Sequence, residues 1–187
     1  MERDKKKSEQ EGSKIFWIDE AGFYLLPMVM STYAPIRETP ILKVKLTKDH
    51  LSSISALEKD GELLIEVQEK TYDSEDVVRF LENMLKTIEG KITIIWDNSP
   101  IHKSKKIREF LKSGAAKRIH LEALPGYAPE LNPAEGIWNW LKKVELKNRC
   151  FLDIESLKKG VIEASIKLIE RKDVCRGCVS ECNYITS

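Results

Sequence analysis

The fold of this chain is decided by residues Lys91–Leu141, which read KITIIWDNSPIHKSKKIREFLKSGAAKRIHLEALPGYAPELNPAEGIWNWL. An apolar run, Ile92–Trp96, ends directly at Asp97, and a basic helix-like segment and a second apolar run at 119–124 follow. Such near-continuous apolar runs are typical of central strands that are covered on both faces. After a Pro-rich bend comes a predicted helix with Glu135 in its first turn. The stretch therefore predicts carboxylates at the ends of secondary elements, where side chains from different elements converge.

The region before this stretch reads as a series of short strands. Residues 14–18 form an apolar run that ends at Asp19, and a polar break with a turn glycine follows at 19–22. A turn at 58–61 joins two of the later strands. The strands expected after the break are residues 23–32, 41–46, 50–57 and 63–67. Together they predict an antiparallel meander.

Apolar residues at helical spacing predict helices in the rest of the chain. The first can be capped by Asp73 or Ser74, and Gly90 stops it. Others are expected at 101–112, 133–147 and 154–171. An antiparallel meander followed by helices that alternate with parallel strands predicts an α/β fold. Its sheet is of mixed direction, with helices on both faces.

The length of 187 residues, with 42% hydrophobic and 33% charged residues, indicates one globular domain with tails. We expect a disordered tail or linker stub at 1–13, the folded domain at 14–172 and a C-terminal extension at 173–187. No apolar run approaches the roughly 20 residues that span a bilayer. The charged N-terminus is unlike a secretory signal. These features predict a cytoplasmic protein with no membrane partner.

Positive charge gathers around the candidate carboxylates. Residues 91–150 contain 12 Lys or Arg against 6 Asp or Glu, a local charge of +6, whereas the whole chain carries +1. Lys103, Lys105 and Lys106 follow Asp97 closely. Basic side chains around an acidic centre suit a polyanion that is held against metal ions. For any single lysine, a solvated helix face is the alternative interpretation.

Three motifs carry a family resemblance: WIDEAGF, IIWDNSPIHKS and LPGYAPELNPAEGIWNWLK. They resemble the mariner superfamily of DDE transposases, in its bacterial and archaeal insertion-sequence branch. The resemblance covers roughly residues 15–141, and the last motif is the most specific of the three. It implies a ribonuclease H-like fold with a mixed five-stranded sheet, which agrees with the element order predicted above.

By motif position, the resemblance assigns a triad to Asp19, Asp97 and Glu135, as catalytic residues and as metal ligands. It implies Mg²⁺, with Mn²⁺ as a substitute, and two ions per site. Elementary chemistry asks for the same residue types. Mg²⁺ is held by a few carboxylates together with water and phosphate, and two ions stabilise the attacking and leaving oxygens of phosphodiester cleavage.

Each carboxylate also has a structural alternative. Asp97 could form a turn, since Asp-Asn after a strand is common turn chemistry. Glu135 lies three residues after Asn132, which is a capping-box pattern, and a capping Glu would face its own helix backbone. Sequence alone does not choose between Asp19 and its neighbour Glu20, although the family's first acidic residue matches Asp19.

Further candidates are assigned to DNA binding. The position of His102 matches the family's histidine after the second Asp, which implies contact with phosphate or ordering of the site; simple packing is the alternative. Asn98 could orient Asp97 or touch DNA, and Tyr127 lies in the loop before Glu135. The remaining candidates are the basic residues Lys103, Lys105 and Lys106.

Three of the four cysteines cluster near the C-terminus. Cys175 and Cys178 have zinc-ligand spacing, Cys182 follows, and Cys150 lies far upstream. No His lies near the cluster, and the family pattern lacks it. We expect reduced thiols rather than a zinc site or disulfides.

The resemblance implies metal-dependent DNA cleavage and strand transfer during transposition of an insertion sequence. It also implies DNA as partner, a working homodimer, and a helix-turn-helix region that full-length relatives carry before the catalytic core. Here the core begins at about Lys14, so we expect that region to be encoded separately or missing. The alternatives are an inactive remnant or regulator that binds DNA or a full-length transposase, and a ribonuclease H-like nuclease that does not integrate.

Overall fold

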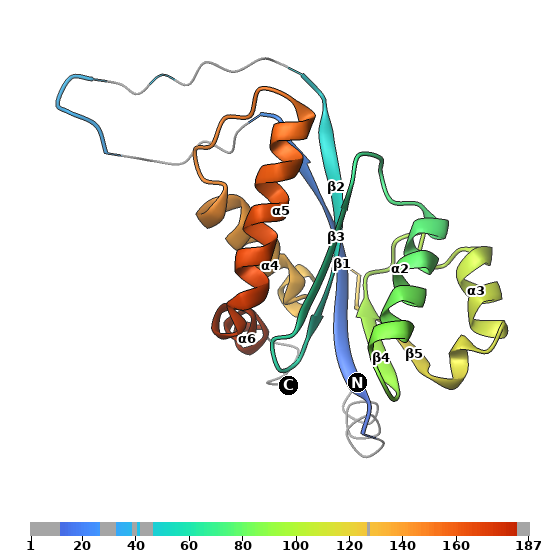
Figure 1. The fold of residues 1–187 in the computed structure, drawn as a ribbon. Coiled ribbons are helices and arrows are strands. Elements are labelled where there is room, and N and C mark those ends of the chain that lie inside the picture. The colour runs from blue at the N-terminus through green and yellow to red at the C-terminus, as the bar shows by residue number, and fades with distance from the viewer. Residues whose placement is uncertain (1–11, 27–32, 39–40, 42–46, 127, 183–187) are drawn as a thin grey trace.

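A mixed five-stranded sheet in the order β3-β2-β1-β4-β5 forms the centre of the fold (Figure 1). The computed structural model describes residues 12–26, 33–38, 41, 47–126 and 128–182. The strands are β1 Lys14–Tyr24, β2 His50–Glu58, β3 Leu63–Gln68, β4 Ile92–Trp96 and β5 Ile119–Ala123. β1, β2 and β3 pair antiparallel, whereas β4 and β5 extend the sheet in parallel from β1. The predicted change from an antiparallel meander to parallel strands is confirmed.

The polar segment after Ile18 does not end the first strand, so the predicted break at 19–22 is wrong. β1 continues to Tyr24, because Asp19 to Tyr24 keep pairing antiparallel with β2 as far as His50. Polar residues are tolerated there because pairing with β2 satisfies their backbone groups. The strands expected at 23–32 and 41–46 fall largely outside the described residues.

Helices cover both faces of the sheet (Figure 1). They are α2 Ser74–Thr87, α3 Lys105–Lys112, α4 Ala134–Trp140, α5 Ile154–Glu170 and α6 Lys172–Glu181. Short 3₁₀ turns lie at Ala115–Lys117 and Pro129–Leu131, and a π-helical turn, η3, spans Leu141–Glu145. In the described part of the chain, no helix is long and apolar enough to cross a membrane.

Three helix expectations need correction. The helix predicted at 101–112 begins only at Lys105, because Ser104 caps it by accepting from the N–H of Ile107. The helix predicted at 133–147 is α4 followed by the wider turn η3. A helix that we did not expect, α6, occupies 172–181. By contrast Asp73 caps α2, which is one of the two caps predicted.

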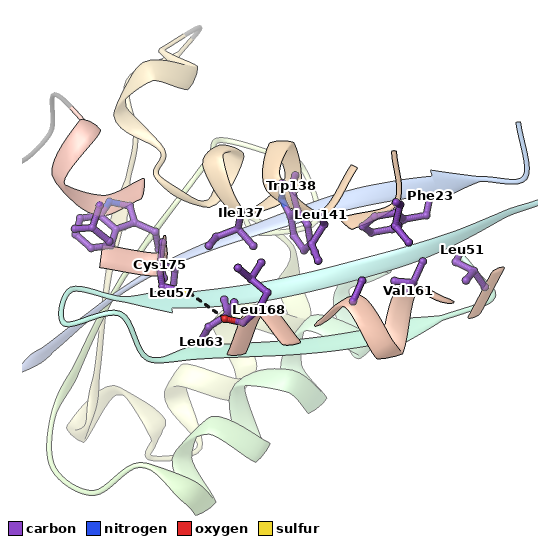
Figure 2. Packing of buried hydrophobic residues seen from close by; sticks show 14 of the residues in the cluster. Phe23, Leu51, Leu57, Leu63, Ile137, Trp138, Leu141, Val161, Leu168 and Cys175 are labelled. Carbon is purple, nitrogen blue, oxygen red and sulfur yellow. Dashed lines mark hydrogen bonds between the residues drawn. The ribbon is translucent and has the colours of Figure 1, made fainter. Parts of the chain in front are cut away.

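The sheet separates two apolar cores, and β1 contributes to both. Ile15, Trp17 and Phe23 pack on the side of α4, α5 and α6, whereas Phe16 and Ile18 pack on the side of α2 and α3. Figure 2 shows Phe23 beside Trp138 and Leu141 in the first of these cores. Successive side chains of a strand point to opposite faces, so β1 feeds both cores by simple alternation. The chain thereby forms one domain with a two-sided sheet.

The cysteines of α6 belong to the first core. Cys175 and Cys182 are buried and Cys178 is half-buried. The Cys175 thiol points at the carbonyl of Leu168 (Figure 2), and burial raises its pKa to about 11, so it stays protonated at neutral pH. Cys150 is exposed. The α6 thiols therefore act as small apolar side chains that hold α6 in place.

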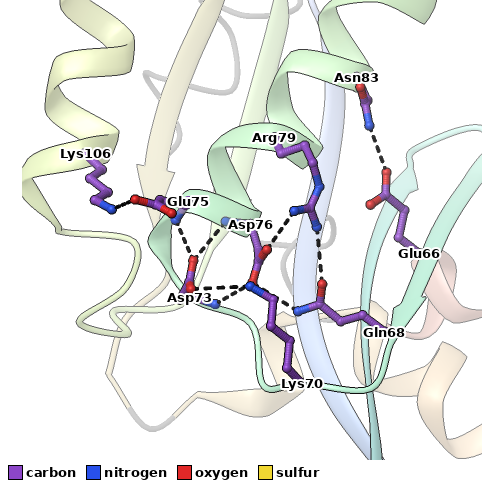
Figure 3. A network of polar contacts seen from close by, with 9 residues as sticks. All are labelled: Glu66, Gln68, Lys70, Asp73, Glu75, Asp76, Arg79, Asn83 and Lys106. Atoms are coloured by element: carbon purple, nitrogen blue, oxygen red, sulfur yellow. Dashed lines mark hydrogen bonds and ion pairs between the residues drawn. The ribbon is translucent and has the colours of Figure 1, made fainter.

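A buried carboxylate anchors α2 to the end of β3 (Figure 3). Asp76 is 1% exposed and accepts from Gln68, Lys70, Arg79 and the N–H of Asp73, which completes a capping box. Burial alone would raise the pKa of Asp76, but these donors outweigh it and hold the pKa well below its usual value.

Replacing Asp76 with Asn should lower the free energy of unfolding by about 2 kcal/mol at pH 7, because hydrogen bonds to a charged group are lost. The pKa of Asp76 in the folded state lies below its unfolded value of about 3.9. The stabilisation from its charge is therefore fully present above about pH 4 and is lost as the pH falls further. Urea unfolding of both proteins at pH 7 and pH 3 measures it.

The gap between wild type and Asp76→Asn should be smaller at pH 3. An equal difference in the free energy of unfolding at pH 7 and pH 3 would contradict a stabilising role for the charge of Asp76. Glu75→Gln is the matched control, since its ion pair with Lys106 is exposed and should contribute less than about 1 kcal/mol (Figure 3).

Candidate active site

Asp19 lies in the middle of β1 on the face that α4 covers. Its Oδ2 accepts a hydrogen bond of 2.9 Å from the indole N–H of Trp138. Trp138 is buried in the first core, so the packing of α4 fixes the direction of this donor. Strand alternation directs the next residue, Glu20, to the opposite face. Of the two neighbouring carboxylates, Asp19 is therefore the one that faces the helix of Glu135.

Asp97 follows β4 directly. The parallel pairing of β1 and β4 sets Trp17 opposite Ile95, and two further residues along each chain bring Asp19 level with Asp97. The Asp97 carboxylate is 54% exposed, and its Oδ1 accepts from the N–H of Ser99 at 2.8 Å. Asp97 thus makes the turn contact that we considered as its alternative role, while remaining beside Asp19.

Glu135 stands in the first turn of α4, three residues before Trp138. Residues at this spacing share a helix face, so Glu135 lies on the side of α4 that meets Asp19. The side chain of Asn132 accepts from Ala134, but α4 has no reciprocal capping box. In contrast α2 and α5 each have one. Within the described residues, then, the Glu135 carboxylate is not used as a cap.

The charges of these carboxylates act on one another. The pKa of Asp19 is raised to about 7, mainly because burial disfavours its charged form and next because Glu135 is negative. Glu20 and Asp97 add to this rise, and the Trp138 hydrogen bond opposes it. A cation placed among these groups would relieve the repulsion.

Lys142, two helical turns beyond Glu135, is the cation on this side of the sheet that senses both Glu135 and Asp19. Burial lowers the pKa of Lys142, and the two negative charges oppose that effect. Its Nζ lies 5.3 Å from the centroid of the Phe23 ring, which holds the ammonium over an aromatic face. Lys142 therefore places a positive charge at the edge of the acidic centre formed by Asp19, Asp97 and Glu135.

His102 is buried between two carboxylates. Its side chain is 1% exposed and its ring stacks on Trp96, with centroids 4.3 Å apart and planes within 2°. Nε2 lies 3.0 Å from Oε1 of Glu20, and Nδ1 lies 2.9 Å from Oδ1 of Asp97. Burial lowers the pKa of His102, but Glu20 and then Asp97 outweigh it, so the net shift is upward.

The other residues predicted to bind DNA make contacts of their own where the structure describes them. Asn98 donates to the carbonyl of Leu124 at 2.6 Å and so joins the ends of β4 and β5. Lys103 is exposed, as are Lys105 and Lys106, which pair with Glu109 and Glu75 respectively. Tyr127 lies outside the described residues. The burial of His102 favours ordering of the site over direct contact with phosphate.

Sequence reasoning missed two parts of this arrangement. The sequence did not single out Trp138 as a site residue, because nothing in a helical apolar stripe signals that its N–H meets Asp19. Glu20 was considered only as a rival of Asp19, although alternation along an unbroken strand could have placed it on the opposite face. The contact between Glu20 and His102 joins residues 82 positions apart, so no local pattern predicts it.

The carboxylates are suited to a divalent metal by their chemistry. They offer hard oxygen donors, which Mg²⁺ and Mn²⁺ prefer. In the described residues, no three His, Cys, Asp or Glu side chains stand close enough to hold an ion as they are. The acidic centre of Asp19, Asp97 and Glu135 nevertheless fits such an ion. Burial and neighbouring negative charge raise the pKa of Asp19, and a bound divalent cation would favour its charged form.

Comparison with known proteins agrees with this geometry. Residues 14–158 match the family described as DDE superfamily endonuclease. The chain belongs to this family. It is 36% identical to the transposable element Tc3 transposase of Caenorhabditis elegans over 69 residues, which are 36% of this chain and 20% of that protein.

Solved structures show the same fold for this DDE endonuclease domain. The Mos1 mariner paired end complex with Mn matches with a TM-score of 0.64 and 18% identity, over 98% of this chain and 59% of that chain. The catalytic domain of Mos1 mariner transposase matches with a TM-score of 0.58 and 16% identity, over 95% and 87%. The fold is therefore the predicted ribonuclease H-like one, and the chain spans less than two thirds of the longer relatives.

The position of Glu135 depends on close packing of α4 against α6. A Cβ on Gly136 would lie 2.9 Å from Sγ and 3.0 Å from Cβ of Cys178, so one helix would have to shift. We expect Gly136→Ala to lower the free energy of unfolding by about 1–2 kcal/mol, although Ala is the better helix former. Urea unfolding measures the change.

Gly177→Ala is the matched control, because it adds the same methyl group to α6 where nothing lies within 4 Å. It should raise stability by up to about 1 kcal/mol. A double-mutant cycle adds a second test: the cost of Gly136→Ala should shrink in a Cys178→Gly background. An unchanged cost there would show that the packing contact does not matter.

Proposed function

We propose that this chain is the catalytic domain of a transposase of the mariner superfamily, from the bacterial and archaeal insertion-sequence branch. In this proposal it cleaves DNA phosphodiester bonds and transfers the freed strand during transposition. The observation that carries the proposal is the acidic centre that β1, the end of β4 and the first turn of α4 form from Asp19, Asp97 and Glu135. Each of these carboxylates comes from a different element.

Two Mg²⁺ ions, or Mn²⁺ in their place, fit this donor set best. Asp19, Asp97 and Glu135 would hold them through their carboxylate oxygens. When bound, the ions would supply charge stabilisation for the attacking and leaving oxygens of an in-line displacement. The metal preference is supported by the carboxylate chemistry and by the Mos1 paired end complex, whose structure was solved with Mn.

The protein's own groups orient the carboxylates and hold the polyanion. Trp138 fixes Asp19 through its indole N–H, while Ser99 fixes Oδ1 of Asp97. Lys142 borders the acidic centre, and its positive charge suits a phosphate that reaches Asp19. The exposed lysines 103, 105 and 106 would bind DNA through phosphates, which positions a duplex without reading its sequence.

Partners and location are part of the same proposal. The partners would be transposon ends and target DNA, since the Mos1 relatives include a paired end complex. A helix-turn-helix module would supply sequence recognition, and two copies of the chain would act as a dimer. The site of action would be the prokaryotic cytoplasm, at the nucleoid.

The test is cleavage of supercoiled plasmid DNA by the full chain with Mg²⁺ or Mn²⁺. We expect Asp19→Asn and Asp97→Asn to reduce the rate at least about a hundredfold while DNA binding persists, because removing a metal ligand costs more than changing its neighbours. Asp173→Asn is the control, since Asp173 lies on the surface and pairs with Arg171.

Each alternative has its own outcome. Cleavage that survives in Asp97→Asn contradicts the triad. DNA binding by the wild type without cleavage favours an inactive remnant or regulator. Cleavage without joining of the freed ends to a second DNA favours a nuclease that does not integrate.

A further inference from the structure

The two neighbouring carboxylates of β1 have different tasks because they face opposite sides of the sheet. Asp19 meets Trp138 on the face of α4, whereas Glu20 meets His102 on the face of α2 and α3. The mechanism proposed above uses Asp19 and leaves Glu20 without a role. Yet Glu20 contacts a buried ring whose other edge reaches Asp97.

The ring of His102 is held on three sides. Trp96 stacks on its face, Glu20 lies at Nε2 and Asp97 lies at Nδ1. Stacking on Trp96 fixes the plane of the ring but leaves it able to turn within that plane. The contact at Nε2 removes this freedom, and so determines where Nδ1 points.

The contact at Nδ1 selects one oxygen of Asp97. Nδ1 lies 2.9 Å from Oδ1, within ion-pair distance, and 3.4 Å from the backbone carbonyl of Asp97, with which it shares a hydrogen bond. Oδ1 also accepts from the N–H of Ser99. Within the described residues the hydrogen bond from Ser99 and the ion pair with His102 both involve Oδ1 and leave Oδ2 without such a contact. The half-exposed Asp97 carboxylate is thereby held in one orientation, with Oδ2 left for a cation.

We propose that Glu20 is a positioning residue that acts on Asp97 through His102, fixing the carboxylate that would bind metal. The inference rests on the proposed function, because the direction of Asp97 matters only if it binds an ion. Partners that orient metal ligands typically change metal affinity 10–100-fold when they are removed. Glu20 acts here from a strand that is separate from the turn carrying Asp97.

The first readout needs no metal. The chain contains three histidines, so the ring signals of His102 can be assigned in ¹⁵N-correlated NMR spectra by single replacements of His50 and His120. In the metal-free wild type we expect a slowly exchanging proton on Nδ1 of His102. Glu20→Ala should abolish it, whereas Glu20→Gln should keep it, because the amide oxygen still accepts from Nε2.

The second readout is Mn²⁺ affinity, measured by electron paramagnetic resonance of free Mn²⁺. Glu20→Ala should weaken binding by about tenfold, and Glu20→Gln by less than about threefold. The matched control is Glu122→Ala, since Glu122 also contacts a histidine, at 3.2 Å, but that ring, His120, is 66% exposed. The control should bind Mn²⁺ like the wild type. If Glu20→Ala does not fold, Glu20→Thr takes its place, because Thr suits a strand.

The outcomes separate the two claims. Retention of the Nδ1 proton in Glu20→Ala overturns the proposal, and so does its loss without a change in Mn²⁺ affinity. If the wild type binds no Mn²⁺, the proposed function fails. The NMR signal alone then decides whether Glu20 orients His102: its loss in Glu20→Ala supports that step and its survival overturns it.

Discussion

The alternation of side chains along β1 is the constraint on which the rest of the structure depends. β1 is the middle strand of five, and it pairs antiparallel on one side and parallel on the other. Because both faces are covered, every second residue must serve a different core. Trp17 and Phe16 satisfy this rule with apolar side chains, and Asp19 and Glu20 continue it with carboxylates. A shift of register by one residue would exchange the two carboxylates and dismantle the site.

Asp76 and Asp19 illustrate how the surroundings of an aspartate side chain decide its role. Asp76 is surrounded by donors from Gln68, Lys70 and Arg79, so its pKa is lowered despite burial and its charge stabilises the fold. Asp19 is near other carboxylates, and burial and their charge together raise its pKa. The first arrangement is complete as it stands. The second concentrates negative charge around a largely buried carboxylate, which is the physical reason for regarding it as a site.

Much of the fold was predictable because its signals are local. A near-continuous apolar run marked β4, a second run broken by His120 and Glu122 marked β5, and helical spacing with Asp73 as a cap marked α2. The beginning of α3 was misjudged, although Ser104 is a good capping residue and carries the signal for it. The clearest feature that sequence reasoning missed is the helix formed by the cysteine segment, α6. Cys175, Cys178, Val179 and Cys182 recur at i, i+3, i+4 and i+7, which is an apolar helical stripe hidden behind the spacing of a zinc motif.

The sequence by itself determined the alternation of helices and strands from α2 to α5, the change from antiparallel to parallel pairing, and the candidate carboxylates with the family they indicate. These properties follow from periodicity and motif spacing, which operate over a few residues. Only the tertiary structure decided that Asp19 faces Trp138 and α4, that Glu20 faces the other way, and that His102 links Glu20 to Asp97. Those choices depend on which face of one continuous strand each side chain occupies, and on contacts between residues far apart in the chain. Tertiary packing determines both the face that each side chain occupies and these long-range contacts, and no local sequence pattern predicts them.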